Sequence, residues 1–383
     1  MRTGRKRRIL RGDSDHPLSG AAMTVSPFTI AVPDAEIALL RERLRATRFP
    51  DVAPNTDFAR GTSGEYLREL VAYWAGEFDW REAEVGLNAI PQFVAEVDGR
   101  PVHFLHRVAA DARGAILLLH GWPDTPFRYR RVLDDLTARG FDCVVPSLPG
   151  FAFTGGHALS SAATADLFQR LMTETLGYDT FVVAGGDVGT VVGSQLARRH
   201  ADRVTALHLT NAEYPTGSEP DLTDEERAYA EFIQYWWATQ GGYAAVQSTK
   251  PQIVGPALND SPAGLAAWML GLIDTGAQDH DVEGAFGGRD ELLTNISIYW
   301  FTQTAATAAD SYAADGWGGE LARITVPTAM AIYPREAQSP RAWCERAANV
   351  VRYTAMPRGG HFAALEVPQD YAGDLIAFLD EPA

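Results

Sequence analysis

Short apolar runs alternate with amphipathic stretches through the middle of the chain. Four of these runs are ILLLH at 116–120, CVVPSLP at 143–149, TFVVAGG at 180–186 and ALHLT at 206–210. Runs this apolar are typical of strands buried on both faces of a parallel sheet, and their alternation with helical stretches indicates βαβ units. The pattern returns in TVPTAMAIY at 325–333 and VVRYTAM at 350–356, before a last helix that begins near Pro368.

The stretch before this alternation reads as mostly helical. Ile37, Leu40 and Leu44 recur at helical spacing and form one apolar stripe, and residues 65–78 form a second amphipathic helix. A hairpin follows, in which Asp98-Gly99 separates FVAEV from PVHFLHRV. The pattern therefore predicts a helical N-terminal region that leads into the sheet.

A second helical stretch interrupts the strand pattern between Tyr214 and Leu321, where Tyr, Trp and Ala are frequent. An insertion at this point is expected to lie over the carboxyl ends of the strands, where open α/β sheets bind ligands. We therefore expect an α/β fold with a mainly parallel sheet, a helical cap insertion and an N-terminal helical extension. The expected segments are a disordered basic tail (1–25), the helical N-terminal region (26–92), the first part of the core (93–213), the cap or lid (214–321) and the second part of the core (322–383).

Charge and composition exclude several classes of protein. The chain carries 49 acidic and 33 basic residues, a formal net charge of −16, which disfavours a nucleic-acid partner because phosphate binding needs a basic face. No 18-residue apolar run occurs, so we expect neither a transmembrane helix nor a membrane anchor. Cys143 and Cys344 lie far apart, outside metal-like spacing, and are expected to be free thiols in the cytoplasm. We expect no metal and no cofactor.

The first residues differ from the rest. Residues 1–12 carry six Lys or Arg side chains and no acidic residue, and no apolar run follows to make a secretory signal. A disordered tail, or a true start at Met23, explains this segment. A basic arm that touches a membrane or nucleic acid is the alternative.

Asp187 is the candidate nucleophile. It stands in Gly185-Gly186-Asp187-Val188-Gly189, after an apolar strand and before a helical stretch, which is the context of the nucleophile elbow of α/β-hydrolases. Glycines allow this sharp turn and close packing around it. An Asp in such a position also serves as an ordinary helix N-cap, so the pentapeptide alone does not decide.

His120-Gly121-Trp122-Pro123 ends another apolar strand. In the α/β-hydrolase fold, the loop at this place supplies one backbone N–H of an oxyanion hole, and the residue after the nucleophile supplies the other. Trp122 and Val188 are therefore the two candidate donors. A simple turn at the proline is the alternative.

His361 follows the last strand, in Arg358-Gly359-Gly360-His361, where this fold places its general base. The acid that supports it is expected between the nucleophile and the histidine in the sequence. Glu336, after the preceding strand, is the candidate, and Glu213, after the ALHLT strand, is the rival. Glu345 and Glu366 read as ordinary surface charges.

Taken together, these motifs resemble the microsomal-type epoxide hydrolases with an N-terminal helical domain. The resemblance covers about residues 26–380 and rests on HGWP, SLPGFAFT, GGDVG, STKPQIVGPALNDSPAGLAAW (248–268), NISIYW (295–300) and RGGHFAALE. It implies an α/β-hydrolase fold and the conversion of an epoxide to a vicinal diol, as in detoxification or secondary metabolism. The chain departs from the mammalian members in lacking their membrane-anchoring segment.

Carried over by position, the resemblance makes Asp187 the nucleophile that forms an ester, His361 the base and Glu336 the acid of a catalytic triad. It makes Tyr243 and Tyr312 the cap tyrosines that hydrogen-bond the epoxide oxygen. Core packing is the alternative for any one tyrosine in this aromatic insertion. A phenol suits the role, because its pKa near ~10 keeps it protonated at neutral pH.

Two other functions remain to be weighed. A haloalkane dehalogenase shares the fold and the Asp nucleophile but commonly has Trp after it, where this chain has Val188. A non-catalytic ligand binder has no need of a nucleophile, an acid and a base in register. The expected partner is a small-molecule epoxide, with Trp122 and Trp300 as candidate substrate-binding residues. The Trp-rich cap is compatible with an aromatic epoxide and equally with core packing, and a homodimer is one option for the assembly.

Overall fold

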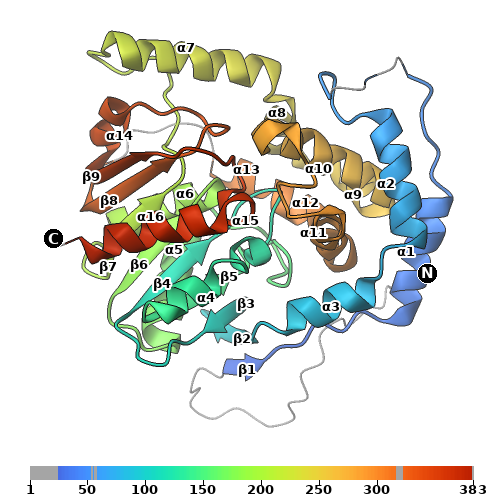
Figure 1. The fold of residues 1–383 in the computed structure, drawn as a ribbon, viewed down its shortest axis with the longest axis horizontal. Helices are drawn as coiled ribbons and strands as arrows, with labels where there is room; N and C mark the ends of the chain where they lie inside the picture. The colour runs from blue at the N-terminus through green and yellow to red at the C-terminus, as the bar shows by residue number, and fades with distance from the viewer. Residues whose placement is uncertain (1–24, 53–54, 56–57, 316–321, 382–383) are drawn as a thin grey trace.

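Nine strands form one sheet in the order β1-β2-β3-β5-β4-β6-β7-β8-β9 (Figure 1). The computed structural model describes residues 25–52, 55, 58–315 and 322–381, so the expected basic tail and the question of Met23 lie outside the described residues. The strands are β1 (Val25–Pro27), β2 (Gln92–Val97), β3 (Arg100–Arg107), β4 (Gly114–Leu119), β5 (Phe141–Pro146), β6 (Phe181–Gly185), β7 (Val204–Leu209), β8 (Ile324–Ile332) and β9 (Ala348–Ala355).

The sheet is antiparallel from β1 through β3 to β5 and parallel from β5 through β4 to β9. Each strand expected from an apolar run is present, and the sheet is mainly parallel, as expected. Asp98 and Gly99 turn the β2–β3 hairpin with positive φ values of 53° and 71°, as this dipeptide favours. The short strand β1 was not expected, because its three exposed residues carry no apolar alternation.

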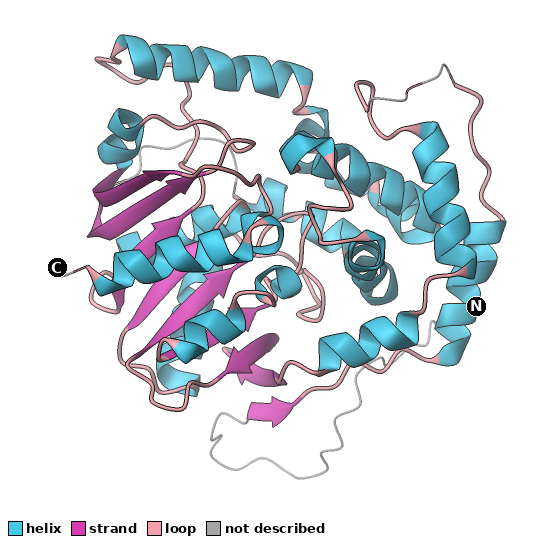
Figure 2. Ribbon diagram, viewed as in Figure 1, coloured by secondary structure: helices cyan, strands magenta, loops and turns pink. Residues whose placement is uncertain are grey.

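Helices cover both faces of the sheet (Figure 2). On one face, α4 (Leu133–Ala138) packs on β5 and α16 (Pro368–Asp380) packs on β8. On the other, α6 (Val188–Arg199) packs on β4, β6, β7 and β8, and α5 (Ser161–Arg170) packs on α6. The parallel strands are therefore buried on both sides, which explains why their sequences are continuously apolar.

The cap lies between β7 and β8 and is helical within the described residues. Its α-helices are α7 (Asp224–Thr239), α8 (Gly242–Thr249), α9 (Gly255–Asp260), α10 (Pro262–Gly276), α11 (Arg289–Thr302), α12 (Ala305–Ala309) and α13 (Ser311–Ala314), with 3₁₀ turns at Pro251–Ile253 and Gln278–His280. The core also contains α14 (Arg341–Ala347), α15 (Ala363–Glu366), a 3₁₀ turn at Pro126–Tyr129 and a π-turn at Leu171–Thr175.

The N-terminal helices α1 (Asp34–Arg45), α2 (Gly64–Gly76) and α3 (Trp80–Asn88) contact the cap. In Figure 1, α1 and α2 lie beside α10, away from the sheet, whereas α3 lies between α11 and the β2 end of the sheet. Trp74 of α2 donates its indole N–H to Ser297 Oγ of α11 at 3.0 Å, and the Trp80 ring stands edge-on to Phe301 at 4.7 Å. The N-terminal helices therefore pack against the cap and help to hold α11 in place.

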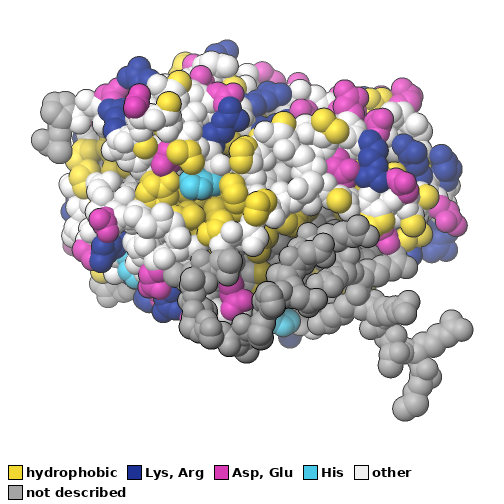
Figure 3. Space-filling model, turned by 90° about the horizontal axis from the view of Figure 1, so that it is seen from below, with side chains coloured by type: hydrophobic (Ala, Val, Ile, Leu, Met, Phe, Trp, Pro, Cys, Tyr) yellow, Lys and Arg dark blue, Asp and Glu magenta, His cyan; other side chains and the backbone are white. Residues whose placement is uncertain are grey.

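Both cysteines are free, and the face drawn in Figure 3 carries charges of both signs around a group of apolar side chains. Cys143 and Cys344 are buried and free. No helix in the described part of the chain is long and apolar enough to cross a membrane. On the face shown in Figure 3, acidic and basic side chains are intermingled.

The contact between α6 and β4 predicts that Gly189 tolerates no side chain. A Cβ atom there would stand 2.1 Å from the backbone carbonyl oxygen of Leu119. We expect Gly189→Ala to lower the free energy of unfolding in urea by about 1–3 kcal/mol, as overpacking does. The matched control is Gly86→Ala in α3, where no atom lies within 4 Å of the added Cβ. We expect this control to raise the free energy of unfolding by roughly 0.5–1 kcal/mol. Equal effects of the two substitutions would contradict this account of the packing.

Candidate active site

Asp187 occupies the turn between β6 and α6. Its backbone has φ 57° and ψ −126°, an uncommon conformation for a residue with a side chain. Its backbone N–H donates to Asn211 Oδ1 at 2.9 Å, and the same oxygen accepts from Thr190 Oγ1 at 2.7 Å. Asn211, which follows β7, therefore holds the turn in place, a role that its sequence context did not reveal.

Two backbone N–H groups reach the Asp187 carboxylate. The Trp122 N–H donates to Oδ1 at 2.8 Å, and the Val188 N–H also hydrogen-bonds the carboxylate. Gly121 makes this approach possible, because a Cβ there would stand 2.3 Å from Asp187 Oδ1. The arrangement can stabilise negative charge on one oxygen of the Asp187 side chain.

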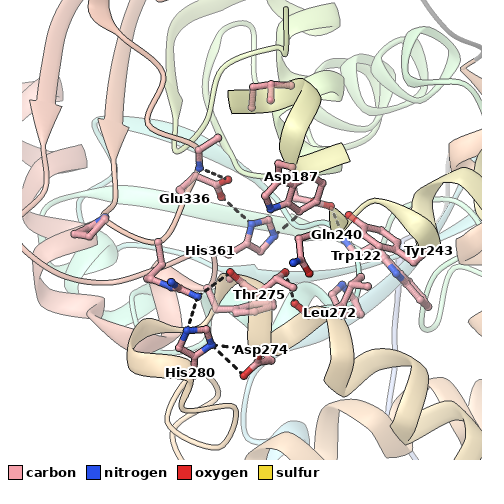
Figure 4. A pocket seen from close by; sticks show the side chains of 18 of the residues that line it. Trp122, Asp187, Gln240, Tyr243, Leu272, Asp274, Thr275, His280, Glu336 and His361 are labelled. Atoms are coloured by element: carbon pink, nitrogen blue, oxygen red, sulfur yellow. Dashed lines mark hydrogen bonds and ion pairs between the residues drawn. The ribbon is translucent and has the colours of Figure 1, made fainter. Parts of the chain in front are cut away.

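His361 and Glu336 complete a row of side chains that ends at Asp187 (Figure 4). His361 Nδ1 lies 2.7 Å from Glu336 Oε2, and His361 Nε2 lies 3.5 Å from Asp187 Oδ2. A buried carboxylate at Nδ1 leaves Nε2 free to exchange a proton on the side of Asp187. The rival Glu213 lines a cavity next to Asp187 but pairs with Arg198, at 2.7 and 2.8 Å, and not with His361.

The pKa values in this row follow from burial and from neighbouring charges. Burial alone would lower the pKa of His361, but the charges of Glu336 and Asp187 and the hydrogen bond to Glu336 raise it to about 9. Burial raises the pKa of Asp187, while His361 and the N–H groups of Trp122 and Val188 oppose that shift. The pKa of Glu336 is lowered, because its interactions with His361 outweigh its burial. The resting site thus favours an imidazolium between two carboxylates.

A buried ion pair between Asp124 and Arg128 contacts the backbone of the loop that carries His361. Arg128 and Asp124 are 1% and 0% exposed, and Arg128 Nη1 lies 2.5 Å from Asp124 Oδ2. Asp124 Oδ1 accepts the Gly121 N–H at 2.7 Å, and Arg128 Nη2 donates to the backbone carbonyl of His361. The pair therefore joins the HGWP loop, which carries the Trp122 N–H, to the loop that carries His361.

Tyr243 and Tyr312 face each other from α8 and α13. Their ring centroids lie 6.1 Å apart, and their phenols hydrogen-bond one another. Burial raises the pKa of both phenols, and the nearby Asp187 charge raises it further. Both therefore remain protonated and able to donate a hydrogen bond near Asp187.

Two cavities meet at Asp187. The larger, about 610 Å³, extends past Trp122 and His361, and the smaller, about 330 Å³, extends past Val188 and Tyr312. Figure 4 shows Asp187, His361 and Tyr243 around one pocket, with His280 and Asp274 at its far side. Volumes of this order are typical of small-ligand sites.

Two expectations from the sequence need correction. Trp300 is not among the described residues that line either cavity, because α11 is buried along both faces and the ring packs into the core at 9% exposure. Trp236 lines both cavities instead. Glu366 is no ordinary surface charge, since it accepts the backbone N–H groups of Phe362 at 3.0 Å and Gln278 at 3.1 Å. Glu366 thereby connects the loop that carries His361 to Gln278 of the cap.

Comparisons with known proteins identify the family. Residues 25–129 match the family described as epoxide hydrolase N terminus, and residues 114–253 match the alpha/beta hydrolase fold. A Stigmatella aurantiaca relative provisionally named as an epoxide hydrolase is 36% identical, over 92% of this chain and 84% of that protein. Epoxide hydrolase 1 of Oryctolagus cuniculus is 30% identical, over 96% of this chain and 91% of its own length.

Solved structures agree with this result. The juvenile hormone epoxide hydrolase of Bombyx mori superposes with a TM-score of 0.81 at 28% identity, over 93% of each chain. The Aspergillus niger epoxide hydrolase also gives 0.81 at 28% identity, over 94% of this chain and 97% of that one. The fold and site define an α/β-hydrolase, and the chain belongs to the epoxide hydrolase family, a hydrolase acting on epoxides.

The buried pair predicts a specific pattern of stability. Arg128→Met leaves Asp124 as an unpaired buried charge, and we expect it to lower the free energy of unfolding by about 3–5 kcal/mol. The double variant Asp124→Asn/Arg128→Met removes both charges and should be more stable than the single variant in the same denaturant titration. A double variant that is no more stable than Arg128→Met would show that the charge pair is not the source of the loss.

Proposed function

We propose that the chain converts an epoxide to a vicinal diol in two steps, through an ester on Asp187. In the first step, Asp187 Oδ2 attacks one ring carbon and the bond from that carbon to the ring oxygen breaks. Tyr243 and Tyr312 hydrogen-bond the ring oxygen, and one phenol gives it a proton. The support for this step is that both phenols and the nucleophile line one cavity.

In the second step, His361 takes a proton from water, and the resulting hydroxide attacks Cγ of the Asp187 ester. Negative charge then develops on Oδ1, which faces the Trp122 and Val188 N–H groups. One such donor typically lowers a barrier by ~2.7–4 kcal/mol. Collapse of this intermediate breaks the ester bond, and the departing alkoxide takes the hydroxyl proton, which releases the diol and restores the Asp187 carboxylate. The proton that His361 gained returns through solvent to the phenolate left by the first step, so water and the epoxide are the only net reactants.

The charges of the site favour this order of events. Forming the ester removes the negative charge of Asp187, which is one cause of the raised pKa of His361. The imidazole therefore loses its proton more easily once the ester exists, which is when a base is needed. The observation that carries the proposal is the arrangement of Asp187 between two N–H donors and a His361 that is paired with Glu336.

The arrangement does not favour halide release. A dehalogenase needs a donor for the leaving halide, commonly a Trp after the nucleophile, and that position is Val188 here. The two phenols suit an alkoxide oxygen, which must gain a proton. Turnover of styrene oxide against 1-chlorobutane tests this choice directly.

Removing the base should trap the ester. In His361→Gln, the attack by Asp187 still occurs, but hydrolysis stalls because no group activates water. We expect mass spectrometry after brief exposure to styrene oxide to show one added substrate mass on the peptide that contains Asp187. The double variant Asp187→Ala/His361→Gln should show none. An unmodified His361→Gln enzyme with its epoxide unconsumed would contradict the two-step mechanism.

Glu336 should matter for hydrolysis more than for ring opening. In Glu336→Gln, His361 loses its orienting carboxylate, and we expect ester hydrolysis to slow by about 10²-fold or more, within the range of general-base effects. The wild-type rate of hydrolysis should rise with pH, because only neutral His361 accepts a proton. The variant should reach its plateau at lower pH, since loss of the Glu336 charge lowers the pKa of His361.

Glu213→Gln is the matched control for this pH profile, because Glu213 also lines a cavity beside Asp187 but pairs with Arg198 and not with His361. Stopped-flow single turnovers separate the two steps. An inactive Glu213→Gln together with a nearly normal Glu336→Gln would show that Glu213, and not Glu336, is the acid that supports His361.

A further inference from the structure

Four side chains line both cavities, namely Asp187, Tyr243, Tyr214 and Trp236. The first two are the proposed nucleophile and a proposed proton donor. The other two, Tyr214 and Trp236, take no part in the proposed chemistry. Because each borders both cavities, we describe them as the partition between two spaces that meet at Asp187. Each cavity flanks a different neighbour of Asp187, since the larger borders the His361 loop and the smaller borders the start of α6.

Tyr214 is placed to shape this partition. It follows β7, is 39% exposed, and stands edge-on to Trp237 with 5.9 Å between ring centroids. Tyr214 lines both cavities together with Asp187. The ring therefore lies close to the nucleophile as well as to the cap.

The two cavities differ in chemistry. The smaller is lined by the apolar side chains of Val191, Ala212 and Trp237 and by two carboxylates that already have partners. Glu213 pairs with Arg198, and Asp315 accepts the Ser161 hydroxyl. Its volume of about 330 Å³ exceeds the ~150 Å³ of an apolar cavity that holds a benzene molecule. The larger carries polar groups at its far side, where His280 Nδ1 lies 3.3 Å from Asp274 Oδ1 and His280 Nε2 lies 3.3 Å from an Arg335 nitrogen.

Attack on an epoxide places both ring carbons beside Asp187, with the ring oxygen held at the tyrosines. A substituent on one ring carbon then points toward one cavity, and a substituent on the other carbon toward the second. A terminal epoxide would fill only one of them, whereas an epoxide substituted at both carbons would fill both.

We infer that the preferred substrate is an epoxide that carries a substituent on each ring carbon, with a compact apolar group in the smaller cavity and a larger group in the other. Tyr214 and Trp236 divide the two and decide which carbon faces Asp187. This inference rests on the proposed function and adds the substrate class to it.

The test compares kcat/KM for trans-stilbene oxide, with a phenyl ring on each carbon, and styrene oxide, with one. Val191→Phe narrows the smaller cavity from a partly buried position on α6. We expect it to lower the ratio of kcat/KM for stilbene oxide to that for styrene oxide at least about 10-fold, because the single ring of styrene oxide still has the larger cavity.

Gln195→Phe is the matched control. It adds the same ring one helical turn further along α6, outside both cavities, and should leave the ratio unchanged. A urea titration of each variant checks that it is folded.

Two results would overturn the inference while leaving the proposed function in place. One is a wild-type enzyme that opens styrene oxide and not stilbene oxide, and the other is a folded Val191→Phe with an unchanged ratio. A wild-type enzyme that opens neither oxide would overturn the proposed function itself, and the inference with it.

Discussion

The backbone at Asp187 turns from β6 into α6 with a positive φ, and this turn lifts the carboxylate above the end of the sheet. The turn is held by close contacts that allow little adjustment. Gly189 lies against the Leu119 carbonyl, Gly121 lies under the carboxylate, and Asn211 accepts the Asp187 N–H. Because Trp122 belongs to the loop after β4, the same contacts bring its N–H to Asp187. The tight turn at Asp187 therefore sets the position of its carboxylate and of the N–H groups of Trp122 and Val188.

Close to this turn, buried carboxylates are paired with buried positive charges. Three carboxylates, on Asp187, Glu336 and Asp124, surround His361 and Arg128. Such charges are costly to bury unless they are paired, and here each has a partner of opposite sign within 3.5 Å. The proposed ester would remove one of the negative charges and so shift the proton equilibrium of His361. In the proposed mechanism, the charge on Asp187 therefore helps to set the pKa of His361.

The sequence predicted the parts of the site that depend on local order. Apolar runs located the strands, and Asp187 and His361 stand directly after strands, where periodicity and turn chemistry are informative. Residues defined by long-range contacts were missed. The sequence gives no signal for Asp124 and Arg128, because Arg128 bonds the His361 carbonyl, 233 positions away in the chain. Only the folded chain separates Glu336 from Glu213. Trp300 was misassigned because aromatic content does not distinguish a cavity wall from a core.

The central claim is that the oxygen added to the epoxide comes from Asp187. A single turnover in ¹⁸O-labelled water, with enzyme in excess over styrene oxide, tests it most directly. The proposed mechanism predicts a mostly unlabelled diol, with the label in the peptide that contains Asp187, because solvent oxygen refills the carboxylate during ester hydrolysis. A fully labelled diol in this first turnover, with no label in the peptide, would mean that water attacks the epoxide directly. Asp187 would then be a base, and the N–H groups of Trp122 and Val188 would have no oxyanion to stabilise.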